Sequence, residues 1–547
     1  MSAPRNSTPT WSQGSQHWLV LGLILSLGLV LRLWRLASKP LWVDEIITSI
    51  FGLGRNFDQF PADKALPLTA VPDLFTLKAD VGCGAIASHL ASQSTHPPLF
   101  FCLLHSWLVT IAPWTDNFAW QVRSLSVVWG VAAIAALYLL NRLAFSPTAG
   151  LVGAGVMALS PFAVYLSQEA RHYTLPITLI TLGLACQVKL HQQLLAKRSR
   201  LWLWALWSLC HCVALYSHYF CALAIAAQWL TLLLFCWCFQ IDGWLRRCAK
   251  GAIAYTIPLL VFIPWLPTFW QHFNSPKTGW LSTPDGINPL IQTLAGWAVM
   301  MVSLPVERQT LMVQLVAGLL TLVALGWLIK VAIAGSKRLP RSSGRFTLVA
   351  FLLFTVLEFL AVIYLLQKDI SIAPRYHFVY FPAVCALLGA FLSCAPQQWR
   401  SLMLTGLILG ISSLCVVYNL AFQKPYAPAL VAERFNAEPA PVAIMMAYHN
   451  TLEMAVGLSY GLALAQIRET PGDLLMVRFT DEFGGIWQTL ETLPVQPEYL
   501  WAIAPGYFDD SFPTSVRLKG GQICELEPEQ FFRLGFPYQR YWCGRIP

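Results

Sequence analysis

The residues of this chain that could do chemistry are ionisable side chains beside the ends of apolar segments. Two adjacent carboxylates, Asp44 and Glu45, follow the first apolar segment. Ionisable groups at membrane depth are costly, and they tend to line functional cavities. For each one taken singly, a solvated or snorkelling end residue is the alternative explanation. The other members of the set are His96, Arg123, Glu169, Arg171, His172, His218, Lys368, Asp369 and Arg375.

The composition places the chain in a membrane. Of its 547 residues 56% are hydrophobic and 12% are charged, and the mean hydropathy is +0.56. Soluble domains carry roughly 25% charged residues. Apolar runs of about 20 residues, long enough to cross a bilayer, recur from Trp18 to Phe422 and are missing after Gln423. The first run lacks a small-residue cleavage site, so we expect a retained helix rather than a signal peptide.

The net charge of +9 comes from basic clusters between apolar segments, at 197–200, 246–250 and 337–345. This is the positive-inside pattern, which places the clusters in the cytoplasm, and no nucleic-acid-binding motif is present. A cytoplasmic N-terminus (1–17) and an outward first helix then put the polar loop 38–95 outside, with Asp44 and Glu45.

Each crossing moves the chain to the opposite side of the membrane, so the number of crossings before a basic cluster must leave that cluster in the cytoplasm. The cluster at 197–200 stays inside only if one of the segments before it does not cross, and the short, less apolar 98–113 is the weakest. We expect it to lie along the outer surface as an interfacial helix. The stretch 290–304 is likewise expected to be interfacial or re-entrant. About 11 crossings result, at 18–37, 124–144, 149–167, 173–190, 201–216, 220–239, 251–270, 311–331, 346–366, 376–393 and 402–422.

The fold class is therefore mainly α and polytopic: a transmembrane domain over 18–422 and an external soluble domain over 423–547. In the tail, strand-like runs at 442–448, 474–479 and 499–504 alternate with helical stretches at 452–465 and 482–490, which predicts a small α/β domain. It contains no phosphate loop or nucleophile motif, so we expect it to shape or cover the external site.

Most of the 14 cysteines lie in apolar segments, where small buried hydrophobes are the expectation, and no metal site is implied. Cys524 and Cys543 lie in the tail. If the tail is external they could form a disulfide, but the spacing alone leaves that open.

Seven short motifs follow one another along the chain: Arg32-Leu-Trp-Arg-Leu, Leu41-Trp-Val-Asp-Glu, His96-Pro-Pro-Leu, Arg123-Ser-Leu, Ser160-Pro-Phe, Gln168-Glu-Ala-Arg-His-Tyr173 and Pro374-Arg-Tyr376. Their order resembles that in the GT-C glycosyltransferases. Within that class the chain is most similar to bacterial relatives of dolichyl-phosphate-mannose protein mannosyltransferases and of the lipid A aminoarabinose transferase. The similarity covers 20–190 well and 250–395 loosely, and the order of the motifs carries it rather than any one of them.

The resemblance implies transfer of a sugar from a polyprenyl-phosphate donor to a hydroxyl of a lipid, glycan or protein acceptor on the external face, with inversion. The attacking hydroxyl must lose a proton, and a carboxylate at the membrane edge is a suitable base. We assign that role to Asp44. Glu45 would orient the acceptor or hold a cation, with an ordinary loop carboxylate as the alternative.

The leaving lipid phosphate needs cationic donors at headgroup level. We expect His96 and Arg375 to supply them, with Arg171 and Arg123 as further candidates that could instead anchor helix ends. Glu169 and Tyr173 are expected near the acceptor or a metal. The Asp-x-Asp pattern of some relatives is missing there, so the cofactor stays unknown: a divalent cation is compatible with the sequence but not required by it.

Two other functions fit a polytopic chain: a transporter or flippase of lipid-linked sugars, and a non-catalytic assembly protein. The ionisable residues lie at one edge rather than at mid-depth, and no inverted pair of broken helices is present, which argues against transport. The joint presence of Asp44, His96 and Arg375 argues against a non-catalytic role. The expected location is the plasma (inner) membrane, with the active site on the external or periplasmic side.

Overall fold

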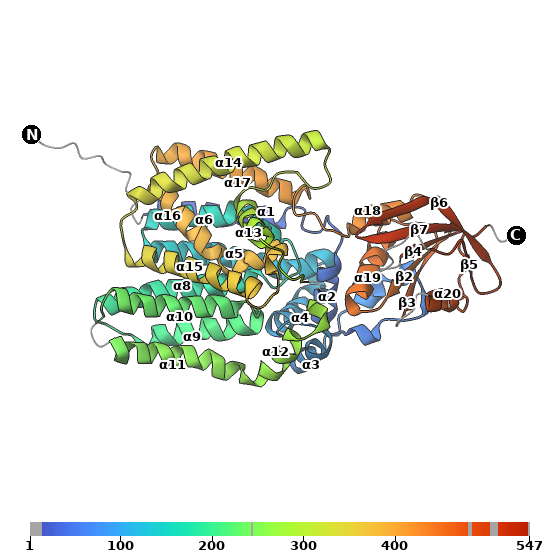
Figure 1. The fold of residues 1–547 in the computed structure, drawn as a ribbon, viewed down its shortest axis with the longest axis horizontal. Helices are drawn as coiled ribbons and strands as arrows, with labels where there is room; N and C mark the ends of the chain where they lie inside the picture. The colour runs from blue at the N-terminus through green and yellow to red at the C-terminus, as the bar shows by residue number, and fades with distance from the viewer. Residues whose placement is uncertain (1–13, 242–243, 280, 480–483, 504–511, 545–547) are drawn as a thin grey trace, which may run out of the picture. The chain divides into compact units, whose positions relative to one another are not determined.

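A computed structural model describes residues 14–241, 244–279, 281–479, 484–503 and 512–544 (Figure 1). The chain forms two compact units. The helical unit takes its described residues from 1–36, 94–100 and 123–422, and the sheet unit takes them from 37–93, 101–122 and 423–547. The loop 38–95, which we expected to belong with the membrane helices, therefore lies mostly in the same unit as residues 423–547. The side chains of the basic cluster at 246–250 lie outside the described residues.

The helical unit confirms a multi-pass membrane protein. Over the described residues, eight helices are long and apolar enough to span a membrane, or nine if the bent pair α6–α7 is one span. The predicted 11 crossings also need the shorter apolar helices α9 and α16, whose crossing stays a prediction. The helices are α1 (Ser15–Leu33), α5 (Phe118–Ala144), α6 (Pro147–Leu159), α7 (Pro161–Ser167), α8 (Thr174–Leu195), α9 (Leu201–Ser217), α10 (Cys221–Cys238), α11 (Trp244–Phe262), α12 (Leu266–Phe273), α13 (Asn288–Met301), α14 (Leu311–Arg338), α15 (Ser343–Tyr364), α16 (Phe381–Ser393) and α17 (Gln398–Val417).

The predicted span 149–167 is broken by a bend of 59° between α6 and α7. Pro161 has no backbone N–H, so the carbonyl of Met157 loses its helical partner. Buried Arg32 of α1 replaces it: Nη2 donates to Met157 O at 3.1 Å and Nη1 donates to Ala158 O at 3.1 Å. The broken helix end thus has its carbonyls satisfied inside the protein, as a membrane interior requires.

The same segment caps α1 in return. Gln168, which follows α7, donates from Nε2 to Trp34 O at 2.8 Å and to the carbonyls of Leu31 and Arg32 at 3.3 Å. Gly130 of α5 lets the helices approach, since a Cβ there would clash with Ser167 Oγ. These contacts fix the chain on both sides of the bend, and the fixed segment leads directly into residues 169–173.

The sheet unit contains one seven-stranded mixed sheet in the order β1-β3-β2-β4-β7-β6-β5. The three strands and two helices predicted in the tail are confirmed, while β1, β5, β6 and β7 were not predicted. The strands are β1 (Lys64–Pro67), β2 (Val442–Tyr448), β3 (Gly472–Arg478), β4 (Tyr499–Ile503), β5 (Ser515–Arg517), β6 (Ile523–Leu534) and β7 (Phe536–Trp542). The helices are α2 (Val43–Gly52), α3 (Cys83–Gln93), α4 (Leu99–Ile111, mostly within this unit), α18 (Pro428–Phe435), α19 (Thr451–Ala465) and α20 (Gly484–Leu490).

Helices cover both faces of the interior strand β2, which explains its unbroken apolar sequence. Met445 shares a buried core with Ile486 and Leu490 of α20. On the other face, Gly457 of α19 packs against Met446 so closely that a Cβ would clash with that side chain. The first loop adds β1 antiparallel to β3, which joins residues far apart in sequence into one sheet.

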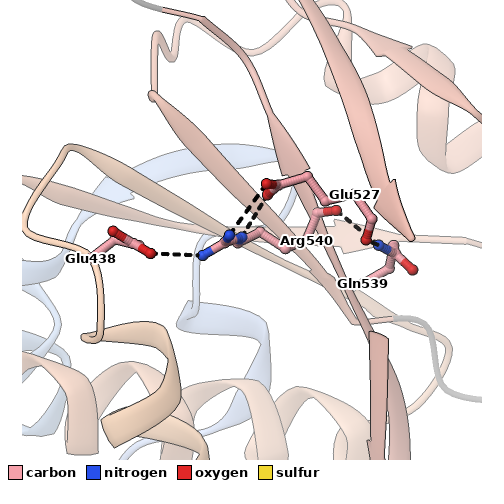
Figure 2. A network of polar contacts seen from close by, with 4 residues as sticks. All are labelled: Glu438, Glu527, Gln539 and Arg540. Atoms are coloured by element: carbon pink, nitrogen blue, oxygen red, sulfur yellow. Dashed lines mark hydrogen bonds and ion pairs between the residues drawn. The ribbon is translucent and has the colours of Figure 1, made fainter. Parts of the chain in front are cut away.

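Covalent and ionic links fasten the sheet unit further. Cys524 and Cys543 form a disulfide, which settles the question that the sequence left open, and a second one joins Cys83 to Cys102. The disulfide between Cys83 and Cys102 was not predicted from the sequence. Figure 2 shows Arg540 in a fork with Glu527, at 2.6 and 3.2 Å, and paired with Glu438 at 3.1 Å.

Candidate functional site

The predicted site residues fall in both units. Asp44 and Glu45 belong to the sheet unit, and the others belong to the helical unit. Each group is described within its own unit. Those of the helical unit are His96, Arg123, Glu169, Arg171, Tyr173 and Arg375.

A cluster of arginine and histidine side chains forms where several helices of the helical unit end. Arg171 and His172 lie between α7 and α8, and His218 directly follows α9. Nη2 of Arg171 lies 3.2 Å from Nε2 of His96. The ring of His172 lies 4.9 Å from that of His96 and 4.7 Å from that of His218. Arg375 lies in the 3-10 helix Pro374–Val379, and its charge acts on His96, His172 and His218. These five residues are called the cationic cluster below.

Hydrogen bonds define the protonation of His96. Arginine can only donate, so Nε2 of His96 accepts from Arg171 and the ring proton sits on Nδ1, 3.0 Å from Ser94 Oγ. Burial lowers the pKa of His96 well below its usual value, and the charge of Arg171 lowers it further. His96 is therefore neutral at neutral pH, and it orients Arg171 rather than adding a charge.

His172 and His218 are neutral for the same reasons. Burial, followed by the charge of Arg171, lowers the pKa of His218 to about 3. Its Nδ1 accepts from the backbone N–H of Phe220 at 3.0 Å, so Nε2 carries the proton. Burial, His218 and Arg171 also lower the pKa of His172 well below the usual value.

The electrostatic character of the cluster is positive. Over the described residues, every neighbouring charge that shifts the three histidine pKa values is basic: two arginines and other histidines. An anion placed here would meet permanent charges on Arg171 and Arg375 and N–H groups on neutral imidazoles. Such fixed donors suit a phosphate, whose bonds to arginine are strong and directional.

Arg171 is held firmly in place. Its backbone carbonyl accepts from Ser126 Oγ of α5 at 2.9 Å, and its guanidinium lies 5.7 Å from the ring centre of Tyr173. Tyr173 is only 1% exposed. It therefore supports Arg171 from inside the protein, whereas its predicted place beside an acceptor stays a prediction.

Arg123 and Glu169 also take part in backbone contacts. Buried Arg123 donates from Nη1 to Leu36 O at 2.7 Å, just after α1, as expected of an anchor for a helix end. The backbone carbonyl of buried Glu169 accepts from the N–H of Arg171 at 2.7 Å. A direct role for either side chain toward donor or acceptor stays a prediction.

In the sheet unit, Asp44 and Glu45 lie in the first turn of α2, where the helix dipole favours negative charge. The Glu45 carboxylate accepts from the N–H of Trp42 at 3.4 Å and is 1% exposed, so it caps the helix. Asp44 is partly exposed. Asp44 is thus the more accessible of the two carboxylates.

The tail holds the chain just before Asp44. Ser459 of α19 donates from Oγ to Leu41 O at 2.5 Å. The ammonium of Lys424 lies 4.3 Å from the ring centre of Trp42. The sheet unit therefore includes both Asp44 and the contacts that position its helix. In the described part of the chain, no group of three or more His, Cys, Asp or Glu side chains is placed to hold a metal ion.

Comparison with known proteins places this geometry in context. Residues 95–268, less than half of the chain, match the family model described as dolichyl-phosphate-mannose-protein mannosyltransferase. The crystal structure of ArnT from Cupriavidus metallidurans in the apo state matches 96% of this chain and 98% of its own, with 12% identity and a TM-score of 0.54. The fold resembles that of ArnT. The structure of the same protein bound to undecaprenyl phosphate matches equally well, with 13% identity and a TM-score of 0.54. No curated protein sequence matches the chain.

The ArnT-like fold and the family model confirm the resemblance inferred from the sequence. The structure brings together His96, Arg171 and Arg375 from the predicted set. His172 and His218 were noted at the predicted external edge but were not assigned to the phosphate site. Both could have been assigned from the sequence, because His172 precedes one apolar segment and His218 follows another, on the same predicted side of the membrane as Arg171.

Proposed function

We propose that this chain is an integral membrane glycosyltransferase that moves a sugar from a polyprenyl-phosphate donor to a hydroxyl acceptor. The observation that carries the proposal is the cationic cluster. His96, Arg171, His172 and His218 all fall within residues 95–268, the segment that matches the mannosyltransferase model. The ArnT-like fold supports it, because ArnT has been crystallised with undecaprenyl phosphate.

The chemistry of the cluster suits the leaving group. In the proposed reaction the acceptor oxygen bonds to the anomeric carbon as the bond from that carbon to the phosphate oxygen breaks. The electron pair stays on the phosphate, whose charge grows from about minus one to about minus two. Arg171 and Arg375 then stabilise the transition state more than the bound donor, which is the condition for catalysis.

Asp44 is the proposed base, and it takes the proton of the attacking hydroxyl. Its place in the first turn of α2 favours the ionised form that a base needs. We assign Glu45 a positioning role, because its carboxylate caps the same turn through Trp42. The acceptor, whether lipid, glycan or protein, and the sugar are not assigned. No other function is favoured by an observation in the structure.

We further propose that the reaction occurs on the external face of the plasma membrane, which is the inner membrane in a two-membrane envelope. The basic clusters support this through the positive-inside rule. The cysteines support it independently. Both disulfides lie in the sheet unit, whereas the free cysteines of the described chain lie in the helical unit. Disulfides persist in oxidising compartments, which fits an external sheet unit.

The test compares lipid-linked sugars and envelope glycans by mass spectrometry in cells with the gene, without it, and with Asp44→Asn. We expect a donor to accumulate and a glycan to lose a sugar when the gene is missing. Asp44→Asn should reproduce both changes while reaching the membrane at the normal level. Unchanged glycans in the deletion would refute the proposed function, and full activity of the Asn variant would remove Asp44 as the base.

A further inference from the structure

An open groove of about 570 Å³ runs along the last turns of α14, within the helical unit. Its walls combine apolar side chains, such as Ile329 and Ile333, with the cationic Lys330, Lys337 and Arg338. Pro396, in the link between α16 and α17, lines it as well. The groove lies apart from the cationic cluster in sequence and composition, and the proposed glycosyl transfer does not use it.

The three cations of the groove have no partner among the described residues. None of the three forms a hydrogen bond or an ion pair with a described residue, and all three side chains are exposed. Arg345 of α15 provides a contrast, because it donates to Ser336 O at 3.0 Å and to Leu339 O at 2.9 Å. The surrounding chain cannot balance the charge, since 308–357 and 370–432 contain no Asp or Glu.

The length of α14 places the cations near its C-terminal end at the depth of the lipid headgroups. The helix has 28 residues and is therefore about 42 Å long, against a hydrocarbon core of about 30 Å. Ile329 and Ile333 are 57% and 51% exposed, as expected for side chains that face lipid. Lys337 and Arg338 occupy the last turn, where long cationic side chains reach the interface.

One side of α14 packs closely against α16. Gly335 of α14 packs directly against the backbone of Phe391 in α16, where any side chain would clash. Lys330, Ala334 and Lys337 are spaced by four and three residues, so they share one face of the helix. The two lysines therefore project along the same wall, with apolar surface between them.

We propose that this groove binds an anionic glycerophospholipid, with its phosphate on Lys330, Lys337 and Arg338 and an acyl chain along Ile329 and Ile333. Basic pockets between transmembrane helices recognise anionic lipid headgroups in this way. The apolar wall favours a lipid over free phosphate, because inorganic phosphate leaves that wall without a contact.

The test measures lipid retention by native mass spectrometry, with the full chain in nanodiscs of phosphatidylcholine containing added phosphatidylglycerol. The triple variant Lys330→Gln, Lys337→Gln, Arg338→Gln removes the charges. At about 1 kcal/mol for each basic residue near a membrane surface, we expect its apparent affinity to fall about 100-fold. A matched control, Lys197→Gln, Arg198→Gln, Arg200→Gln, removes three cations from the link between α8 and α9 and should retain the lipid normally.

A second variant tests the groove itself with all charges kept. Ala334→Phe should fill the groove between the lysines and reduce retention by at least about tenfold, whereas a lipid held by charge attraction alone would be retained by this variant as well as by wild type. Thermal unfolding in phosphatidylcholine alone shows that each variant folds. Equal retention by wild type and both variants would overturn the proposal. So would retention of added inorganic phosphate equal to that of phosphatidylglycerol, or selective retention of undecaprenyl phosphate in place of phosphatidylglycerol.

Discussion

Replacement of Arg171 by Gln removes one of the two permanent cations of the cluster. The side chain is 3% exposed, and its Nη2 lies 3.2 Å from His96 Nε2. If the donor phosphate binds here, the charge that Arg171 faces roughly doubles as the sugar departs. Loss of one fixed donor to a developing charge costs about 10²-fold to 10³-fold in turnover. We therefore expect kcat to fall about 100-fold, with a smaller change in KM for the donor.

The rate of the Arg171→Gln variant should also depend on pH differently from the rate of wild type. In the native protein, burial and the charge of Arg171 both lower the pKa of His96. Without that charge the pKa rises, while burial, the larger cause, still holds it below its usual value, so His96 takes up a proton at a higher pH than it does in the native protein. A protonated His96 replaces part of the lost charge. The rate of the variant relative to wild type should therefore increase toward low pH, and the added change His96→Gln should abolish the increase.

The assay is sugar transfer by purified protein in nanodiscs, followed by mass spectrometry, with the unfolding midpoint measured on each sample. Arg142→Gln is the matched control, since Arg142 binds Tyr138 Oη at 2.9 Å. It lies about 24 Å along α5 from Ser126, the residue that holds Arg171. A kcat within about threefold of wild type, a change of only about 0.7 kcal/mol, would refute a phosphate role for Arg171. A rate ratio that stays constant with pH would refute the assigned state of His96.

Four further predictions test the scaffold. Ser459→Ala removes the hydrogen bond to the carbonyl of Leu41, just before Asp44, and should lower kcat about fivefold at unchanged donor KM in the same transfer assay. Ser459→Thr keeps a hydroxyl and should restore kcat. Arg32→Lys should destabilise the chain by ~2 kcal/mol in reversible unfolding, since one ammonium cannot serve every acceptor of the guanidinium. Removing the 19-residue link by Cys524→Ser should cost ~3 kcal/mol and lower the unfolding midpoint. Stability should be constant above about pH 6.5 and fall below it, because the unfolded chain then binds protons that the buried His96, His172 and His218 do not, the folded pKa of His218 being about 3. His218→Gln should make the fall of the unfolding midpoint with pH smaller without abolishing it.

Local signals were enough to predict most of the helical unit. Hydropathy located the spans, and the basic clusters assigned their expected sides. The bend inside 149–167 was missed because hydropathy averages over it, although Ser160-Pro161 is a local sign of a break. His96, Arg171 and Arg375 were predicted together because each follows a segment boundary on the same expected side.

Long-range partners in the sheet unit could not be predicted. Strand β1 has four residues and comes from the first loop, so only its pairing with β3 identifies it. Strand β6 contains a polar stretch and a register shift between Leu526 and Phe531, which hides the alternation of a strand. Cys102 lies in an apolar run, and its spacing gave no indication of Cys83 as a partner.

The motifs that carried the family resemblance prove to have backbone roles as well as chemical ones. Pro161 breaks a membrane helix, and the break leaves carbonyls that no water can satisfy at membrane depth. Arg32 satisfies two of them, and Gln168 caps α1 in return. Arg32 and Gln168 therefore stabilise the bend together, each by satisfying carbonyls at the helix end that the other residue's segment leaves open. Since the chain emerges from this junction directly into Arg171, the motif that closes the helix ends also sets the position of the cationic cluster.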